Sequence, residues 1–320
     1  NKTIVIVGAG HAGVEAALAI GNLGVSAILV TMDRLAVGRM SCNPAIGGLG
    51  KGHLVKEIDA LGGIMGRAAD RCGLQFKMLN TSKGRAVWSP RAQIDKKLYS
   101  SFIQQSISKH KKISIIQDEV VDFSVDKGAI NAVFLRGGKT ISAVGLVVCS
   151  GTFLNGLIHI GADCFPAGRL GEKASFKLSE SLVNRGFNVS RLKTGTPPRL
   201  FGPSINWDNL ISAVGDDAPV PFSIQTRLPF RPKNIPCYIV NTNAAVHDIL
   251  GDNLDKSSIC PIKVCHSFLS ICIAASGLPA VGARFGDILS IITRYSPPNE
   301  LRVLHVLIEP SSTSFHFFGS

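Results

Sequence analysis

The sequence predicts an α/β fold built on a parallel sheet, and three neighbouring patterns near its start support this prediction. Residues 3–7 form an apolar, β-branched run that ends at Gly8, and residues 14–23 carry alanine and leucine at helical spacing. Residues 27–30 form a second apolar run. Strand, glycine turn, helix and strand in this order form the unit from which parallel sheets are built. With 320 residues, 45% of them hydrophobic, the chain can bury a sizeable core.

Two longer helices and a hairpin are predicted next. Residues 53–69 and 91–112 carry apolar side chains at i, i+4 spacing, which is typical of a helix with one buried face. Gly137-Gly138 predicts the turn of a hairpin between residues 132–135 and 140–143. Residues 145–149 then form a buried strand, and we expect it to return to the first sheet at its ligand-binding edge.

Changes in composition divide the chain into three predicted regions. Residues 1–193 form the first α/β domain, and residues 194–257, which are rich in proline and irregular signals, form a second, mixed α/β domain that faces the substrate. The last 64 residues hold three of the eight cysteines and eleven serines but only seven charged residues. Residues 258–320 are therefore expected to be a divergent tail, disordered or out of register.

The charge balance favours an anionic partner. A net charge of +12 and a pI of about 9.5 suit RNA, a phosphorylated cofactor or an acidic membrane face, although a basic surface without a partner is also compatible. None of the cysteines forms a Cys-x-x-Cys pair, which favours a reducing compartment over a disulfide framework. Histidine and cysteine show no convincing metal-ligand spacing, so no metal site is predicted.

The turn after the first strand, Gly8-Ala-Gly-His-Ala-Gly13, predicts a dinucleotide site. In such a turn the first glycine makes the bend, the second lets the backbone approach a pyrophosphate, and the third lets the helix pack on the strand. The acidic residue that usually ends the second strand and helps to distinguish FAD from NAD is not in its usual position, because this strand ends at Thr31 and Asp33 follows two residues later. We expect Asp33 to be a turn residue, and the choice between FAD and NAD stays open at this point.

A glycine-rich loop from Met40 to Val55 contains Cys42. A buried cysteine is usually inert, but a thiol in a polar loop near cations has a lowered pKa and a larger thiolate fraction. We therefore favour a reactive Cys42. Lys51 and His53 either bind phosphate or face water, and the nearby glycines favour anion binding.

Several motifs together resemble one family. They are Gly8-Ala-Gly-His-Ala-Gly13, Ser41-Cys-Asn-Pro-Ala-Ile-Gly-Gly-Leu-Gly-Lys-Gly-His53, Lys56-Glu-Ile-Asp-Ala-Leu-Gly-Gly63, Arg91-Ala-Gln-Ile-Asp95, Gly151-Thr-Phe-Leu154 and Arg191-Leu-Lys-Thr-Gly-Thr-Pro-Pro-Arg199. The chain from residue 3 to about residue 257 resembles the MnmG (GidA) family, the tRNA uridine 5-carboxymethylaminomethyl modification enzymes. A folate- and FAD-dependent tRNA uracil-5-methyltransferase is a related alternative, and an inactive FAD-binding fragment is another.

The resemblance implies a Rossmann-like FAD-binding domain and a second domain that also serves NADH. In the family, FAD, NADH, methylenetetrahydrofolate and glycine or ammonium act together at C5 of the wobble uridine of tRNA, with an MnmE-like GTPase partner and as a homodimer. No membrane is involved, and the location is the bacterial cytoplasm or the mitochondrial matrix. The FAD contacts carried over by position are Gly8, Ala9, Gly10, His11, Ala12, Gly13, Val120 and Ser175.

Cys42 matches the family cysteine that is proposed to act in catalysis, while Lys51, His53, Lys193 and Arg199 are candidates for the tRNA and uridine side. The family continues with a Gly-Pro-Arg-Tyr-Cys-Pro-Ser segment that residues 258–320 do not reproduce. This departure motivates the hypothesis that the chain is truncated relative to the family and that its last part is out of register, as after a frameshift.

Overall fold

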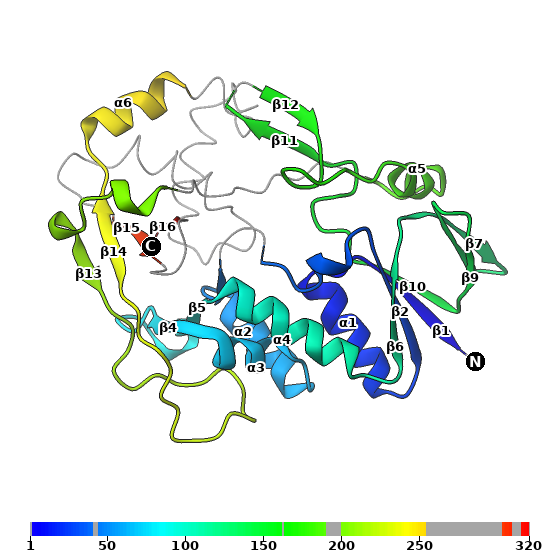
Figure 1. Ribbon diagram of the computed structural model, residues 1–320, viewed down its shortest axis with the longest axis horizontal. Helices are drawn as coiled ribbons and strands as arrows, with labels where there is room; N and C mark the ends of the chain where they lie inside the picture. Colours follow the sequence, from blue (N-terminus) through cyan, green and yellow to red (C-terminus); the bar gives the residue numbers. More distant parts are fainter. Residues whose placement is uncertain are drawn as a thin grey trace.

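The computed structural model describes residues 2–40, 44–161, 163–189 and 200–253, together with strands at 303–308 and 315–319. Its central element is a four-stranded parallel sheet in the order β10-β1-β2-β6 (Figure 1). The strands are β1 (Thr3–Val7), β2 (Ser26–Thr31), β6 (Ile113–Gln117) and β10 (Gly145–Val148). The predicted α/β class and the return of residues 145–148 to the first sheet are thereby confirmed.

The two faces of this sheet are covered differently. Neighbouring residues of a strand point to opposite faces, so Ile6 and Leu29 share one core cluster while Val5 and Val30 share another. The first cluster includes residues of α1 (His11–Asn22) and α4 (Lys96–Ser108). The second includes residues of a three-stranded antiparallel layer and of α5 (Lys177–Asn184). That layer consists of β7 (Val120–Asp126), β8 (Ala129–Leu135) and β9 (Thr140–Ser142).

The layer contains the predicted hairpin, with Gly138 at φ +85° in the turn between β8 and β9. The prediction that residues 145–149 form a buried strand is wrong in one respect. Strand β10 lies at the edge of the four-stranded sheet in the described part of the chain, and Val148 is 39% exposed.

The helix predicted over 53–69 is two helices, α2 (Lys51–Ala60) and α3 (Met65–Cys72). Gly62 lies between them at φ +86°, a left-handed conformation that ends a helix, and its N–H donates to the Asp59 carbonyl. The start of α3 is then bound by a side chain of α1, because the Glu15 carboxylate accepts the backbone N–H of Met65 at 2.7 Å.

The helix predicted over 91–112 begins later than expected. Residues 91–94 belong to β5 (Ser89–Ile94), the middle strand of an antiparallel sheet with β3 (Ala45–Gly47) and β4 (Gly73–Leu79). The Asp95 carboxylate caps α4 by accepting the N–H groups of Lys97 and Leu98 at 2.9 and 3.0 Å. Asp95 thus marks the boundary between strand and helix.

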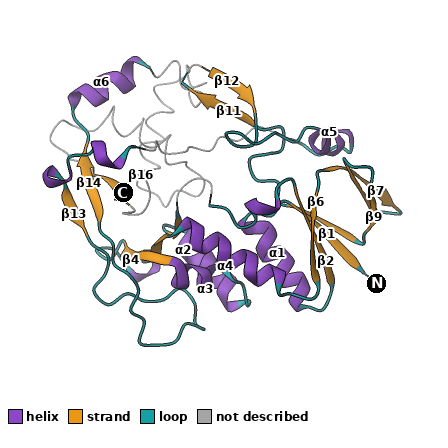
Figure 2. Cartoon of the chain, in the orientation of Figure 1, coloured by secondary structure: helices purple, strands orange, loops and turns teal. Residues whose placement is uncertain are grey.

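The described residues also form elements elsewhere along the chain. They are a pair of antiparallel strands, β11 (Leu157–Ile160) and β12 (Asp163–Pro166), four 3-10 helices (Arg34–Ala36, Arg85–Val87, Gly202–Ser204 and Trp207–Asn209), α6 (Ala244–Asp252) and an antiparallel sheet in the order β13-β14-β15-β16. The strands of that sheet are β13 (Ile211–Ala213), β14 (Cys237–Asn241), β15 (Val303–Ile308) and β16 (Phe315–Gly319). Residues 214–236 carry no helix or strand (Figure 2). The domain boundaries at residues 193 and 257 stay predictions.

Candidate functional site

The turn between β1 and α1 is tightly packed at its first and third glycines. Gly8 has φ +95°, and a Cβ added to it would lie 2.3 Å from the carbonyl oxygen of Cys149, just past β10. A Cβ on Gly13 would lie 1.8 Å from the carbonyl oxygen of Gly8. The helix therefore approaches the strand closely only because both positions lack side chains, as the sequence motif predicts.

The second glycine has a different environment. Gly10 precedes the first residue of α1, and no side chain of a described residue caps this helix. A Cβ added to Gly10 would lie more than 4 Å from every described residue other than its own chain neighbours. The start of a helix offers unpaired N–H groups and the positive end of its dipole, which suit a phosphate. The open space at Gly10, between two filled positions, fits the pyrophosphate of a dinucleotide.

The three side chains of this turn differ in their burial and contacts. Ala9 is buried, and its carbonyl accepts the N–H of Gly38 at 2.9 Å, whereas Ala12 is exposed. His11 lies with its Nδ1 atom 3.4 Å from the Tyr99 hydroxyl, and the two rings meet edge to face. Burial, and then the positive charge of Arg169, lower the pKa of His11 below its ordinary value. His11 is therefore neutral at neutral pH.

The lowered pKa of His11 predicts a pH dependence of stability. The unfolded chain binds a proton to this histidine near pH 6.5 and the folded chain only at lower pH. Stability is thus fully present above pH 6.5 and is lost as the pH falls through the folded pKa. We expect urea denaturation of His11→Gln to show a smaller loss of stability between pH 6.5 and 5 than the unsubstituted chain. Equal losses in the two proteins would contradict the assignment.

The end of β2 is organised by ion pairs. Asp33 accepts the N–H of Leu35 at 2.8 Å and pairs with Arg39 at 3.0 Å, so both of its carboxylate oxygens have partners. Arg39 also pairs with Glu172 at 2.9 Å. Asp33 therefore acts as a turn residue, as expected. Sequence reasoning missed Arg39 and Glu172, because nothing local signals a contact between residues so far apart in the chain.

The two further FAD positions carried over from the family, Val120 and Ser175, are both buried. Val120 is buried at the start of β7, in the same core cluster as Val5 and Val30. Ser175 is also buried and donates its hydroxyl to Glu119 at 2.8 Å, while Glu119 pairs with Arg136. The structure thus connects Ser175 with the neighbour of Val120 through one hydrogen bond. Their role as FAD contacts stays a prediction.

Lys51 and His53 lie in the first turn of α2, and both side chains are exposed. The glycine loop before them is docked on β5, since Gly48 donates its N–H to the carbonyl of Pro90 at 2.8 Å. The N–H of Gly52 donates to Gly48, also within the loop. These two N–H groups already have acceptors, so the loop gives little support to the predicted anion cradle.

Three predicted site residues, Cys42, Lys193 and Arg199, lie outside the described residues. Among the cysteines that the structure does describe, burial raises the pKa of Cys72 and of Cys237 to about 11 and also raises that of Cys149. These three thiols are protonated at neutral pH, in keeping with a packing role, whereas Cys164 is exposed. Within the described residues no group of three or more His, Cys, Asp or Glu side chains could hold a metal ion. None of the described helices is long and apolar enough to span a bilayer.

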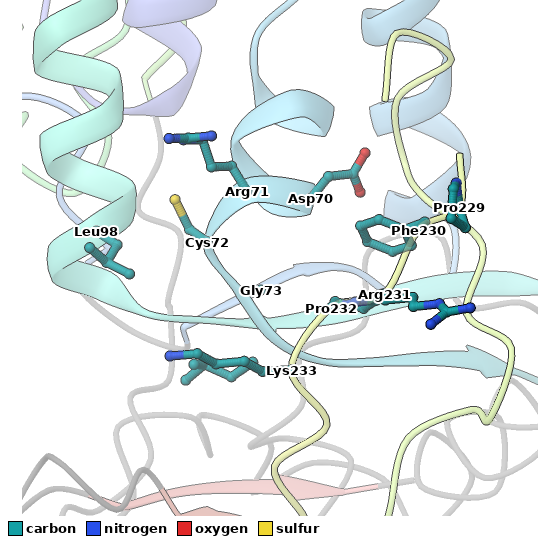
Figure 3. A pocket seen from close by; sticks show the side chains of 11 residues that line it. Asp70, Arg71, Cys72, Gly73, Leu98, Pro229, Phe230, Arg231, Pro232 and Lys233 are labelled. Carbon is teal, nitrogen blue, oxygen red and sulfur yellow. The ribbon is translucent and has the colours of Figure 1, made fainter. Parts of the chain in front are cut away.

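A cleft of about 260 Å³ lies beside Cys72 and away from the predicted site residues that the structure describes. It opens between the end of α3, the start of β4 and the segment Pro229–Lys233, with Arg71, Cys72 and Leu98 along its wall (Figure 3). Pockets for cofactors usually enclose roughly 300 to 1,000 Å³. None of the predicted site residues lines this cleft, and its volume is too small for a dinucleotide.

Comparison with known proteins agrees with the geometry of the turn. The family model described as glucose inhibited division protein A matches residues 3–267, slightly farther than the motifs alone indicate. A protein of Thermodesulfovibrio yellowstonii named tRNA uridine 5-carboxymethylaminomethyl modification enzyme MnmG is 47% identical over 261 residues, or 82% of this chain and 42% of the relative. A protein of the same name from Chlorobaculum tepidum is 47% identical over 262 residues, again 82% and 42% of the two chains.

The crystal structure of GidA from Aquifex aeolicus, form I, matches with a TM-score of 0.86 at 37% identity and covers 99% of this chain and 52% of that one. The form II crystal matches with a TM-score of 0.82, covering 98% and 49%. The chain thus spans less than half the length of the curated relatives that it matches. The match over most of the sequence and the parallel sheet with its glycine turn place the chain in the glucose inhibited division protein A (GidA, MnmG) family.

Proposed function

We propose that this chain binds FAD at the turn between β1 and α1 and takes part in the modification of the wobble uridine of tRNA at C5. The open position at Gly10, next to the start of an uncapped helix, is the observation that supports the first part. The second part is supported by relatives whose names describe tRNA uridine 5-carboxymethylaminomethyl modification enzymes.

The proposed FAD site uses the backbone more than side chains. The N–H groups at the start of α1 bind the pyrophosphate, and Gly8 and Gly13 allow the close approach of strand and helix that orients these groups. His11, which is neutral, adds no positive charge to the site. Val120 and Ser175 are proposed as further contacts. When bound, the flavin supplies the redox chemistry that amino-acid side chains lack.

Cys42 is proposed as the group that attacks the uridine. C5 of uridine is a poor nucleophile until C6 has been attacked, and a thiolate is well suited to a reversible addition of this kind. Lys51, His53, Lys193 and Arg199 are proposed to face the tRNA, whose phosphates attract cations in a salt-dependent way. The exposure of Lys51 and His53 in the first turn of α2 is compatible with that role.

The remaining participants are proposed from the family alone. They are NADH and methylenetetrahydrofolate as co-substrates, glycine or ammonium, an MnmE-like GTPase partner, and a homodimer. The proposed location is the cytoplasm of a bacterium or the mitochondrial matrix. The net charge of +12 supports a polyanionic partner such as tRNA.

The proposal is tested with purified protein in two steps. The chain should retain FAD, seen as flavin absorbance after gel filtration, and modification is then assayed with tRNA, NADH, methylenetetrahydrofolate and the GTPase. Cys42→Ser should bind FAD with unchanged affinity and show no detectable modified uridine by mass spectrometry, in this chain or at the matching position of a full-length relative. Full modification by the serine variant would rule out Cys42 as the attacking group.

A chain that binds FAD but modifies no tRNA, beside an active full-length relative, would favour the FAD-binding fragment. Transfer of a methyl group to C5 would favour the folate-dependent methyltransferase. A chain that retains no flavin would contradict the first part of the proposal.

A further inference from the structure

Arg169 is held rigidly near the start of α1. It lies in a tight turn after β12, in which Gly168 donates its N–H to the Glu172 carbonyl at 3.0 Å and Glu172 donates its N–H to the Arg169 carbonyl at 2.9 Å. The Thr152 hydroxyl donates to the Gly168 carbonyl at 2.7 Å, which fixes this turn to the loop after β10. The guanidinium carbon of Arg169 lies 4.9 Å from the centre of the Phe153 ring. The side chain is therefore positioned by its surroundings.

The guanidinium group of Arg169 is incompletely paired. Its Nη1 atom is buried and has no hydrogen-bond partner among the described residues. The nearest carboxylate oxygen, Oε1 of Glu172, is 3.7 Å away, which is too long for a hydrogen bond. That same oxygen is only 2.9 Å from Nη1 of Arg39. Glu172 is thus committed to Arg39, and a buried donor of Arg169 is left for another acceptor.

The positive charges around Arg169 also favour the binding of an anion. Arg169 lies in the turn that Thr152 fixes to the loop after β10, and the Cys149 carbonyl at the start of that loop lies against Gly8 of the glycine turn. The charge of Arg169 also lowers the pKa of His11, the first residue of α1. It therefore lies near the positive end of the helix dipole, where a second positive charge is unfavourable unless an anion is bound. The positive charge of Arg39 also repels the Arg169 guanidinium, and the nearby acids that attract it are Glu172 and Asp33. Both of these acids are already paired with Arg39.

We propose that Arg169 binds the pyrophosphate of the dinucleotide in front of Gly10, with its unpartnered Nη1 donating to a phosphate oxygen. The position between the start of α1 and the Asp33–Arg39 pair after β2 favours the pyrophosphate over the flavin ring, because a pyrophosphate crosses from the helix toward the ribose at the end of the second strand. A planar guanidinium suits two phosphate oxygens at once. This inference rests on the proposed function, and it adds a side chain to a site otherwise made of backbone.

The test compares the affinities of three probes, FAD, ADP and adenosine, for the chain and its variants. Arg169→Met should weaken both FAD and ADP binding about tenfold or more, because a charged hydrogen bond to phosphate is lost. Adenosine, which has no phosphate, should bind equally to both proteins. Arg169→Lys should recover part of the lost affinity. As a control, Arg34→Met removes an exposed positive charge just after β2 and should change none of the three affinities.

Circular dichroism establishes whether each variant is folded. If Arg169→Met does not fold, the affinities of Arg169→Lys for ADP and adenosine are compared with those of the unsubstituted chain instead. Unchanged ADP affinity in the folded variants would overturn the inference while the proposed function stands. A chain that binds ADP through Arg169 but does not bind FAD would leave the inference intact and contradict the proposed cofactor. A chain that binds neither FAD nor ADP would overturn both.

Discussion

Gly13→Ala should destabilise the chain by about 3 kcal/mol or more, because backbone atoms fill the position of the new methyl group. The added Cβ would lie 1.8 Å from the carbonyl oxygen of Gly8 and 3.0 Å from its carbonyl carbon. Neither atom can rotate away as a side chain would, so relief requires α1 to move off β1. Since α1 contributes Val14 and Ala17 to the main core cluster, this movement also opens the core. Urea denaturation followed by circular dichroism measures the loss.

Gly10→Ala is the matched control within the same turn. Gly10 has φ −72°, which alanine adopts readily, and its added Cβ would lie more than 4 Å from the residues that the structure describes, apart from its chain neighbours. Its stability should therefore stay within about 0.5 kcal/mol of the unsubstituted chain. The new methyl group nevertheless stands where the pyrophosphate is proposed to lie, so FAD affinity should fall. Equal destabilisation by the two substitutions would contradict the view that Gly8 and Gly13 shape the turn while Gly10 faces the ligand.

The sequence was sufficient to predict the elements that depend on local patterns. The strand at 3–7, the turn at Gly8 and the return of residues 145–148 to the sheet all follow from short apolar runs that end at glycine. The break between α2 and α3 was also signalled, by Gly62-Gly63, but the apolar spacing on both sides of it suggested one helix. At this position the glycine pair determines where the helix ends, although the apolar spacing continues past it.

Strand β5 was missed for a different reason. Its residues Arg91 and Gln93 are polar, yet Gln93 is almost fully buried in the small sheet with β3 and β4. Residues 91–94 do alternate between polar and apolar side chains, but Ile94 also begins the i, i+4 spacing with Leu98 and Phe102 that predicts a helix. Arg169 likewise has no local signal, since its importance arises from Phe153 and the start of α1, which only the folded chain brings close to it.

Asp70 anchors residues 214–236, the longest segment without helix or strand among the described residues, and Asp70→Ala should cost about 3 kcal/mol of stability. Its carboxylate accepts the backbone N–H groups of Phe222 and Ser223 at 2.7 and 2.9 Å, and the hydroxyl of Thr226 at 2.5 Å. Phe222 is 0% exposed within the main core cluster, so these bonds hold a core side chain supplied by a loop. Removal of the carboxylate leaves two buried N–H groups without an acceptor, and desolvated donors of this kind are costly.

Urea denaturation of Asp70→Ala should be compared with that of two variants. Asp217→Ala removes an exposed acid from the same segment, and it should change stability by no more than about 0.5 kcal/mol. Asp70→Asn keeps one oxygen acceptor and should fall between the two alanine variants. Limited proteolysis should also cut Asp70→Ala near residues 222–226 sooner than the control, since the loop is released from α3 before the sheet unfolds. Equal stability and equal cleavage of Asp70→Ala and Asp217→Ala would show that Phe222 holds the segment through its core packing alone.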